Sequence, residues 1–300
     1  MEKRRLGKTD MDVSVLGFGG SEIGYEKASP KAVDELLNSA LDAGLNVIDT
    51  AECYWGSEEM IGQAVSGRRN EFCLFTKCGH PHGLESGADW SRQSILESIE
   101  RSLRRLQTEV VDLVQLHSCS EAELRKGEAI AALETARERG YTRYIGYSGD
   151  SRAARYAVDC DAFDTLQTSI NIADQEAIEL TLPRAREKQM GVIAKRPIAN
   201  AAWKTGHKPI EGYHHIYWER LRKLNFQFLR DCSLEESISI ALRFTIGVPG
   251  VHTAIVGTTK PQRWQENAKL LEAGPLSDAR FQAIRHRWEE YAPPTWIGQI

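Results

Sequence analysis

The chain has 300 residues, of which 41% are hydrophobic and 27% are charged, a mixture typical of globular proteins. Its formal net charge of −4 gives no reason to expect a nucleic-acid partner, and no apolar run approaches the length of a membrane span. The N-terminal sequence MEKRRLGKTD lacks the apolar stretch of a signal peptide. We therefore expect a cytoplasmic protein whose six cysteines stay reduced.

Strand and helix signals alternate along the chain, which indicates βαβ units and a parallel sheet. A short hairpin is expected over residues 4–15, where it could close the bottom of a barrel. Eight strand-like runs are separated by helical patterns: 13–20, 45–50, 72–77, 111–117, 142–148, 165–171, 191–196 and 252–257. Eight such units are what a (β/α)8 barrel requires, so we predict an α/β fold, a TIM barrel in one domain over residues 1–300.

Capping residues and breakers locate the helices between these strands. One helix is expected to begin at Ser29–Pro30, and others cover 58–65, 91–106 and, as one long helix ended by a glycine, 121–139. A short helix follows Asp150 and another ends near Met190, while one or two helices are expected between 197 and 247. The second of these begins at the capping pattern SLEE, residues 233–236. A helix over 278–291 and the tail APPTWIGQI are extra C-terminal elements.

Three successive strands end in an acid, a lysine and a histidine, namely Asp49, Lys77 and His117, and Tyr54 follows the first. The C-terminal strand ends of a barrel share one face, so these groups would converge. A tyrosine is protonated at neutral pH and can donate a proton, and a nearby ammonium stabilises the phenolate left behind. Singly, each residue has a structural alternative, such as a helix cap or a hydrogen-bonded core residue. Together they predict a carbonyl reductase with Tyr54 as proton donor, Asp49 holding the ammonium of Lys77, and His117 orienting the carbonyl.

The hydride in such a reaction must come from a cofactor. No GxGxxG motif follows the first strand, which disfavours a Rossmann nucleotide site. Barrels commonly bind phosphate near their last two strands, and IVGTTKPQRWQEN offers Thr258, Thr259 and Arg263 there. An ordinary capped helix with a surface arginine is the alternative. The cysteines and histidines near the strand ends match no metal-binding spacing, so no metal site is predicted.

The chain resembles the aldo-keto reductase family from RRLG near its start to QEN near its end. The matching motifs are VSVLGFG, GLNVIDTAECYWGSEEMIG, FTKC, VDLVQLH, YIGYSG, TLQTSIN and IVGTTKPQRWQEN. The resemblance implies a catalytic tetrad of the same four residues and a nicotinamide cofactor extended across the barrel top. It implies that Ser148 and Gln167 hold the carboxamide, and that Arg263, Glu266 and Asn267 hold the adenosine end.

Three positions depart from the family pattern. Gly149 stands where an asparagine is usual, Lys195 where many members stack an aromatic ring on the nicotinamide, and Gly257 where a lysine often pairs with the phosphate of NADP. Lys195, Gly257, Thr258 and Thr259 complete the predicted cofactor site. Arg263 favours NADPH, because a guanidinium pairs well with a phosphate, and NAD is the alternative cofactor.

The predicted activity is therefore the reversible, NADPH-dependent reduction of aldehydes or ketones to alcohols. Two other functions fit the same motifs: an NAD-dependent dehydrogenase of a sugar or secondary alcohol, and a regulatory subunit that binds NADPH and turns over slowly. The expected partner is a small-molecule carbonyl or alcohol substrate. Tyr25 and Trp55 are candidates for an aromatic wall of its pocket. The sequence does not predict the oligomeric state.

Overall fold

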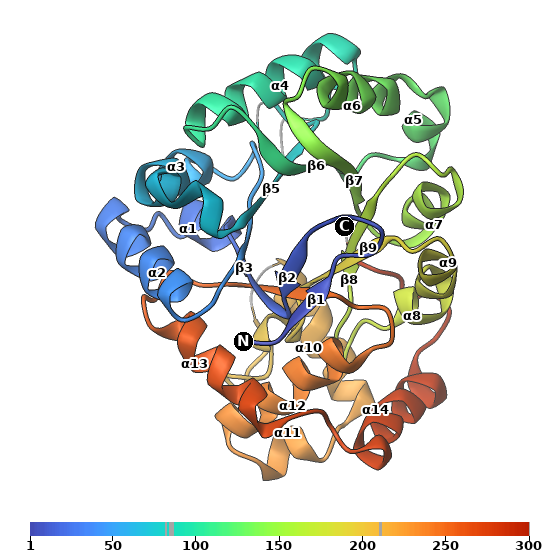
Figure 1. Cartoon of the computed structure of the whole chain (residues 1–300). Coiled ribbons are helices and arrows are strands. Elements are labelled where there is room, and N and C mark those ends of the chain that lie inside the picture. The colour runs from blue at the N-terminus through green and yellow to red at the C-terminus, as the bar shows by residue number, and fades with distance from the viewer. Residues whose placement is uncertain (82, 84–86, 210–211, 300) are drawn as a thin grey trace.

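Eight parallel strands close into a barrel in the computed structural model, which describes residues 1–81, 83, 87–209 and 212–299 (Figure 1). Each strand pairs with the next in chain order, and the last closes on the first. The predicted TIM barrel is confirmed, because each predicted strand run contains one strand. These are β3 (Leu16–Gly19), β4 (Val47–Asp49), β5 (Cys73–Cys78), β6 (Val111–His117), β7 (Thr142–Ser148), β8 (Thr165–Ser169), β9 (Gly191–Lys195) and β10 (Thr253–Gly257).

The predicted N-terminal hairpin is also confirmed and closes the N-terminal end of the barrel. Its strands, β1 (Lys3–Arg5) and β2 (Asp12–Ser14), pair antiparallel. Leu6, Met11 and Val13 of the hairpin pack in one buried cluster with five side chains of the barrel strands: Val47, Phe75, Leu113, Ile193 and Ile255. The hairpin approaches closely at Gly7, where a Cβ atom would lie 2.3 Å from the backbone nitrogen of Gly191. The opposite end of the barrel is thus the face on which a site can form.

Helices surround the barrel, and their apolar faces form a second, larger core against the outer faces of the strands (Figure 1). Two predicted starts are confirmed by serine caps: Ser29 accepts a hydrogen bond from the backbone of Ala32, and Ser233 from that of Glu236. The helices of the first half are α1 (Ser21–Tyr25), α2 (Pro30–Asp42), α3 (Ser57–Val65), α4 (Arg92–Arg105), α5 (Glu121–Lys126), α6 (Glu128–Glu138) and α7 (Ser151–Asp159). Those of the second half are α8 (Glu176–Leu180), α9 (Leu182–Glu187), α10 (Gly212–Leu224), α11 (Phe228–Asp231), α12 (Leu234–Gly247), α13 (Arg263–Leu270) and α14 (Asp278–Tyr291).

Two helix predictions are wrong in detail. The single helix expected over 121–139 is two helices, because Gly127 adopts a left-handed φ of +79° that ends α5 and redirects the chain into α6. The described residues between 197 and 247 hold three α-helices, α10, α11 and α12, rather than one or two.

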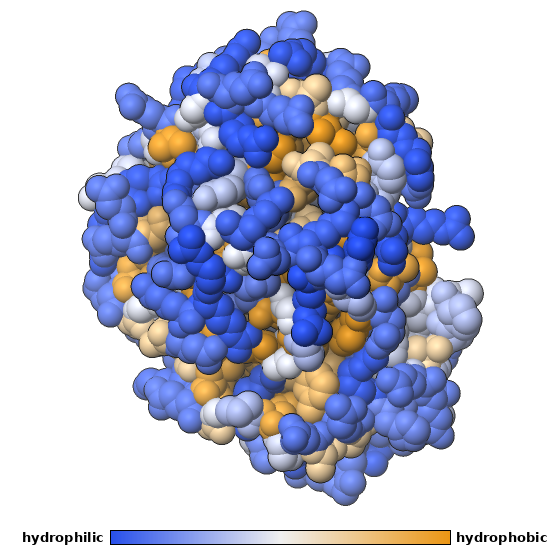
Figure 2. All heavy atoms as spheres, turned by 45° about the vertical axis from the view of Figure 1, so that its right-hand side comes forward, coloured by the Kyte–Doolittle hydropathy of each residue, from blue (hydrophilic) through white to orange (hydrophobic). Residues whose placement is uncertain are grey.

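The face seen in Figure 2 is mostly hydrophilic, with apolar side chains in scattered groups. Among the described residues, no helix combines the length and the apolar character needed to cross a bilayer.

Candidate active site

A buried lysine–aspartate pair lies at the C-terminal end of β4 and β5. The ammonium of Lys77 donates to Asp49 Oδ2 at 2.6 Å and to the backbone oxygen of Thr50 at 2.7 Å. Gln115, on the next strand, donates to the other carboxylate oxygen of Asp49 at 3.3 Å. Burial raises the pKa of Asp49, and the charge of Lys77 opposes that shift. Asp49 therefore fixes the direction of the ammonium.

Tyr54 reaches this pair from the turn between β4 and α3. The ammonium of Lys77 lies 5.0 Å from the centre of the Tyr54 ring, and the ring of His117 meets that ring edge-on at 5.7 Å. The turn is closely packed, since a Cβ atom at Gly24 would lie 2.8 Å from the backbone oxygen of Tyr54. Burial, followed by the charge of Asp49, raises the pKa of Tyr54 well above its usual value. The phenol is therefore fully protonated at neutral pH.

His117 ends β6 on the same face of the barrel. Burial, followed by the charge of Lys77, holds the pKa of His117 well below its usual value, so the imidazole is neutral. The structure thus brings all four predicted catalytic residues together. The arrangement can donate a proton from Tyr54, stabilise a phenolate through Lys77, and hydrogen-bond a substrate oxygen through His117.

The strand register places the predicted carboxamide-binding residues beside this group. His117 is aligned with Ser148 on β7, and Ser148 with Gln167 on β8. The side-chain nitrogen of Gln167 is buried and makes no hydrogen bond of ordinary geometry among the described residues, although the Gln167 amide lies close enough to Asp49 to lower the pKa of that carboxyl. A buried, unpaired amide donor is costly, and a carboxamide oxygen would satisfy it. This end of the barrel therefore fits a nicotinamide, with Ser148 and Gln167 as the residues that would hold it.

Two departures from the family pattern have a structural explanation. A Cβ atom at position 149 would lie 2.4 Å from the hydroxyl of Tyr147, so an asparagine there would displace Tyr147 and break the hydrogen bond of 2.8 Å that it donates to the backbone oxygen of Cys119. Lys195, at the end of β9, pairs with Asp150 at 2.9 Å. The charge of Lys195 is thus compensated beside the predicted nicotinamide position.

Asp150 is the centre of a polar cluster that sequence reasoning missed. Its carboxylate also accepts from the hydroxyl of Thr168 at 2.7 Å and from the backbone nitrogen of Ser169 at 2.7 Å. The C-terminal tail joins this cluster: Arg196 donates to the backbone oxygen of Gln299. Lys195 and Arg196, followed by the hydrogen bond from Ser169, hold the pKa of Asp150 below its usual value against the effect of its burial.

The predicted phosphate residues lie at the end of β10, where α1 covers them. A Cβ atom at Gly257 would lie 1.6 Å from a carboxylate oxygen of Glu22, so a lysine at this position would require the Glu22 side chain to move. The hydroxyl of Thr259 donates to the carboxylate of Glu26 at 2.8 Å, and that of Thr258 accepts from the backbone nitrogen of Lys260 at 3.1 Å. The hydroxyls of Thr258 and Thr259 are thus engaged within the protein.

The residues predicted for the adenosine end lie together on α13, apart from the catalytic group. Arg263 pairs with Glu266 at 3.0 Å, and both side chains are about half exposed, whereas Asn267 is buried. An exposed pair of this kind contributes little to stability, so the guanidinium can exchange Glu266 for a phosphate at small cost.

Other residues of the group were missed by sequence reasoning. Gln115 lies two positions before His117, so the period-two alternation of a strand could have shown that both face inward. Glu52 contacts the group from a neighbouring loop, and no spacing pattern marks it. Cys53 and His80 also contact the group; the sequence indicated their position near the strand ends but gave them no role. Of the two candidate aromatic walls, Tyr25 lies 5.8 Å from the Tyr54 ring, and Trp55 is 69% exposed.

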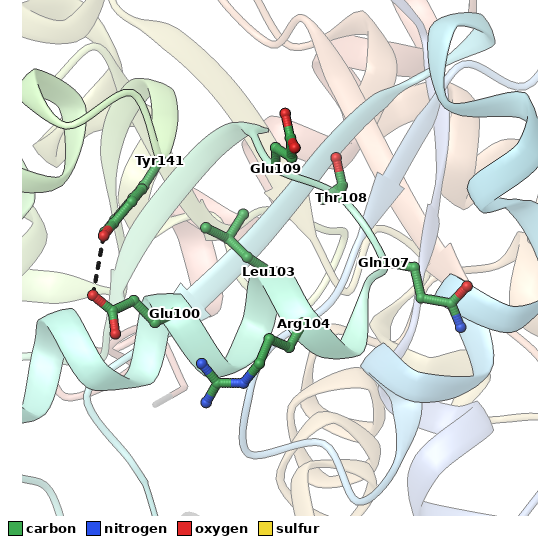
Figure 3. A pocket seen from close by; sticks show the side chains of 7 residues that line it. All are labelled: Glu100, Leu103, Arg104, Gln107, Thr108, Glu109 and Tyr141. Carbon is green, nitrogen blue, oxygen red and sulfur yellow. Dashed lines mark hydrogen bonds between the residues drawn. The ribbon is translucent and has the colours of Figure 1, made fainter.

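A shallow hollow of about 600 Å³ lies elsewhere, at the end of α4 and the starts of β6 and β7 (Figure 3). Within it the hydroxyl of Tyr141 donates to Glu100 at 3.1 Å. The hollow lies at the N-terminal ends of the strands, whereas the catalytic group lies at their C-terminal ends. It therefore has no part in the predicted chemistry. Among the described residues, no group of three or more histidine, cysteine or acidic side chains is placed to hold a metal ion.

Comparisons with known proteins show the family and the fold of the chain. The family model described as "Aldo/keto reductase family" matches residues 15–289. An uncharacterized oxidoreductase, YqkF of Bacillus subtilis, is 30% identical over 95% of this chain and 96% of its own length. The holo form of the aldo-keto reductase AKR11C1 from Bacillus halodurans superposes with a TM-score of 0.83, at 29% identity and 96% coverage of each chain. An aldo-keto reductase from Klebsiella pneumoniae in complex with NADPH gives a TM-score of 0.74, at 25% identity, covering 98% of this chain and 97% of that one.

Proposed function

The chain belongs to the aldo/keto reductase family and is an NAD(P)H-dependent oxidoreductase, and we propose that it reduces aldehydes and ketones with NADPH, with Tyr54 as proton donor. The observation that carries the proposal is the group formed by Tyr54, Lys77 and Asp49. A protonated phenol lies beside an ammonium whose direction is fixed by a buried carboxylate. This arrangement suits proton donation to an oxygen that gains negative charge.

The hydride for the carbonyl carbon would come from a nicotinamide held at this end of the barrel. As negative charge develops on the carbonyl oxygen, Tyr54 transfers its phenolic proton to it. The ammonium of Lys77 stabilises the resulting phenolate, and Asp49 keeps that ammonium in place. Neutral His117 holds the carbonyl oxygen by a hydrogen bond, and Ser148 and Gln167 would orient the carboxamide of the cofactor. In the reverse direction the phenolate accepts the proton of the alcohol.

The role of Tyr54 is tested with Tyr54→Phe. The substitution removes the donated proton and keeps the ring, so carbonyl reduction should fall by about 10³-fold or more. Affinity for NADPH, followed by fluorescence titration, should change less than about twofold, because the cofactor would be held by other residues. A Tyr54→Phe protein that still reduces its best carbonyl substrate at the original rate excludes Tyr54 as the donor.

The preference for NADPH rests on Arg263, whose guanidinium is half exposed at the start of α13. Fluorescence titration with NADPH and NADH, on the original protein and on Arg263→Ala, measures it. We expect Arg263→Ala to weaken NADPH binding by about 10-fold, as for one charge-assisted hydrogen bond lost at an exposed site, and to leave NADH binding unchanged. Tighter binding of NADH, indifferent to the substitution, would favour the NAD-dependent dehydrogenase instead.

A further inference from the structure

Two residues that the proposed mechanism does not use, Cys53 and His80, both contact His117. Cys53 Sγ lies 3.4 Å from His117 Nδ1, and His80 Nε2 lies 2.7 Å from the backbone oxygen of His117. All three residues are at least nine-tenths buried. A carbonyl oxygen only accepts hydrogen bonds, so Nε2 of His80 carries a hydrogen and donates it. One contact therefore holds the ring of His117, and the other holds its main chain.

Glu52, which precedes Cys53 in the chain, connects Cys53 with His80. A carboxylate oxygen of Glu52 accepts hydrogen bonds from the backbone nitrogens of Gly79 at 2.9 Å and of His80 at 3.1 Å. The path from Glu52 to His80, from His80 to His117, and from His117 to Cys53 therefore closes on itself. A closed path of this kind restricts His117 more than either contact would alone. Two of its members, Glu52 and Cys53, belong to the turn that carries Tyr54, so the path connects the proton donor to the imidazole.

The protonation states of the two side chains decide the direction of the thiol contact. Burial raises the pKa of Cys53 to about 12, so the group is a thiol and not a thiolate. His117 is neutral, as described above, and a neutral imidazole has one donor and one acceptor nitrogen. Sulfur is a weak acceptor, whereas an unprotonated imidazole nitrogen is a strong one. A hydrogen bond donated by the Cys53 thiol to Nδ1 is therefore stronger than one donated by Nδ1–H to the sulfur. It leaves the ring hydrogen of His117 on Nε2.

We propose that Cys53 is a positioning residue that donates to Nδ1 and thereby holds His117 as the Nε2–H tautomer. With Nδ1 engaged, Nε2 is the nitrogen through which His117 reaches a bound carbonyl. A carbonyl oxygen carries only lone pairs, so this tautomer binds it, whereas the other tautomer would present a second lone pair and repel it. The inference rests on the proposed function, because that function assigns the carbonyl oxygen to His117.

The tautomer can be measured without turnover, by long-range proton–nitrogen NMR correlation on protein labelled at its histidines. His117→Asn identifies the His117 signals. We expect a single Nε2–H tautomer in the original protein and in Cys53→Ser, because a serine hydroxyl also donates to Nδ1. In Cys53→Ala the donor is gone, and the hydrogen should be shared between Nδ1 and Nε2. A hydrogen on Nδ1 in the original protein, or an unchanged tautomer in Cys53→Ala, overturns the proposal.

Kinetics then separate positioning from packing. Cys53→Ala should lower kcat by about 10-fold, as is usual when the partner of a functional histidine is removed, and Cys53→Ser should restore most of it. Affinity for NADPH should stay within about twofold in both variants. Cys119→Ala is the matched control, because it removes a fully buried thiol two residues beyond His117.

An equal loss of kcat in Cys53→Ala and Cys119→Ala would mean that only packing was lost, and would overturn the proposal. So would an unchanged kcat in Cys53→Ala. An original protein that reduces no carbonyl contradicts the proposed function instead, while the NMR result still decides whether Cys53 sets the tautomer.

Discussion

Two lysine–aspartate pairs with buried carboxylates lie on the same face of the barrel, one in each half. The pKa values of the two carboxyl groups are shifted from the ordinary value in opposite directions. In the half that we propose to be catalytic, which holds β4, β5 and β6, Asp49 pairs with Lys77, and its pKa is raised. In the half that we propose to hold the cofactor, which contains β7 to β10, Asp150 pairs with Lys195, and its pKa is lowered. Both carboxylates are almost fully buried, so burial alone does not explain the difference.

The difference comes from the other groups around each carboxylate. Besides its lysine, Asp49 accepts from the side-chain amide of Gln115 at 3.3 Å, and the amide of Gln167 also lowers its pKa. Asp150 accepts from the hydroxyl of Thr168 and from the backbone nitrogen and hydroxyl of Ser169, with the charge of Arg196 nearby. Hydrogen bonds to the charged form stabilise it, and each added donor lowers the pKa. Asp49 thus depends mainly on its lysine, whereas Asp150 is held by several donors.

The largest expected effect follows from removing each lysine in turn. Lys77→Met leaves Asp49 without its main partner, and should lower the free energy of unfolding by about 3 kcal/mol and abolish carbonyl reduction. Lys195→Met should cost less than half as much, because Thr168 and Ser169 still solvate Asp150. Urea unfolding of both variants measures the comparison. Equal losses of unfolding free energy in the two variants would show that the additional hydrogen-bond donors to Asp150 contribute little to stability.

The pH dependence of stability should separate the two carboxylates. The folded pKa of Asp150 is lowered, so its ionised form stabilises the fold above the unfolded pKa, and that contribution disappears as the pH falls through the folded pKa. The folded pKa of Asp49 is raised, so stability should fall as the pH rises from the unfolded pKa towards the folded one.

Asparagine at each position removes that dependence. Asp150→Asn should lose about 2 kcal/mol at pH 7 and progressively less towards pH 3, whereas Asp49→Asn should cost less at pH 7 than at pH 4. Thermal or urea unfolding across this range, with the original protein as reference, measures both slopes. Parallel slopes for the two variants would contradict the comparison.

The same contrast explains how much of the molecule the sequence could predict. Asp49, Lys77 and His117 end successive strands, and Tyr54 follows in the next turn, so the barrel register alone brings them together. Strand alternation and capping serines were also sufficient to locate the barrel and several helix starts. Gly127 was the exception, since a glycine inside a helical pattern does not reveal whether it will adopt a left-handed φ.

The cofactor half depends on contacts that no local pattern contains. Asp150 and Arg196 are organised by Ser169 and by a tail about a hundred residues further along the chain. Glu22 reaches Gly257 from the other end of the sequence. Such contacts follow from closure of the barrel and the return of the tail, so the sequence predicts residues such as Ser148 and Gln167 but not the network around them.

The smallest expected effect concerns that tail. Gly298 packs against Asp150 so closely that a Cβ atom there would lie 2.5 Å from the Asp150 Cβ, which forces the tail or Asp150 to move. Gly298→Ala should therefore weaken the contact of Arg196 with the Gln299 carbonyl, lower the free energy of unfolding by about 1 kcal/mol, and leave the catalytic half unchanged.

Gly67→Ala is the matched control, because a Cβ atom there meets nothing within 4 Å. Urea unfolding measures the stability of both variants, and limited proteolysis with mass spectrometry follows cleavage near residue 296. Gly298→Ala should be cleaved faster and bind NADPH more weakly. If its single-turnover rate at saturating NADPH is nevertheless retained, the tail supports only the cofactor half. A lower single-turnover rate would instead mean that the two halves are coupled through the register of β6, β7 and β8, where His117, Ser148 and Gln167 lie side by side.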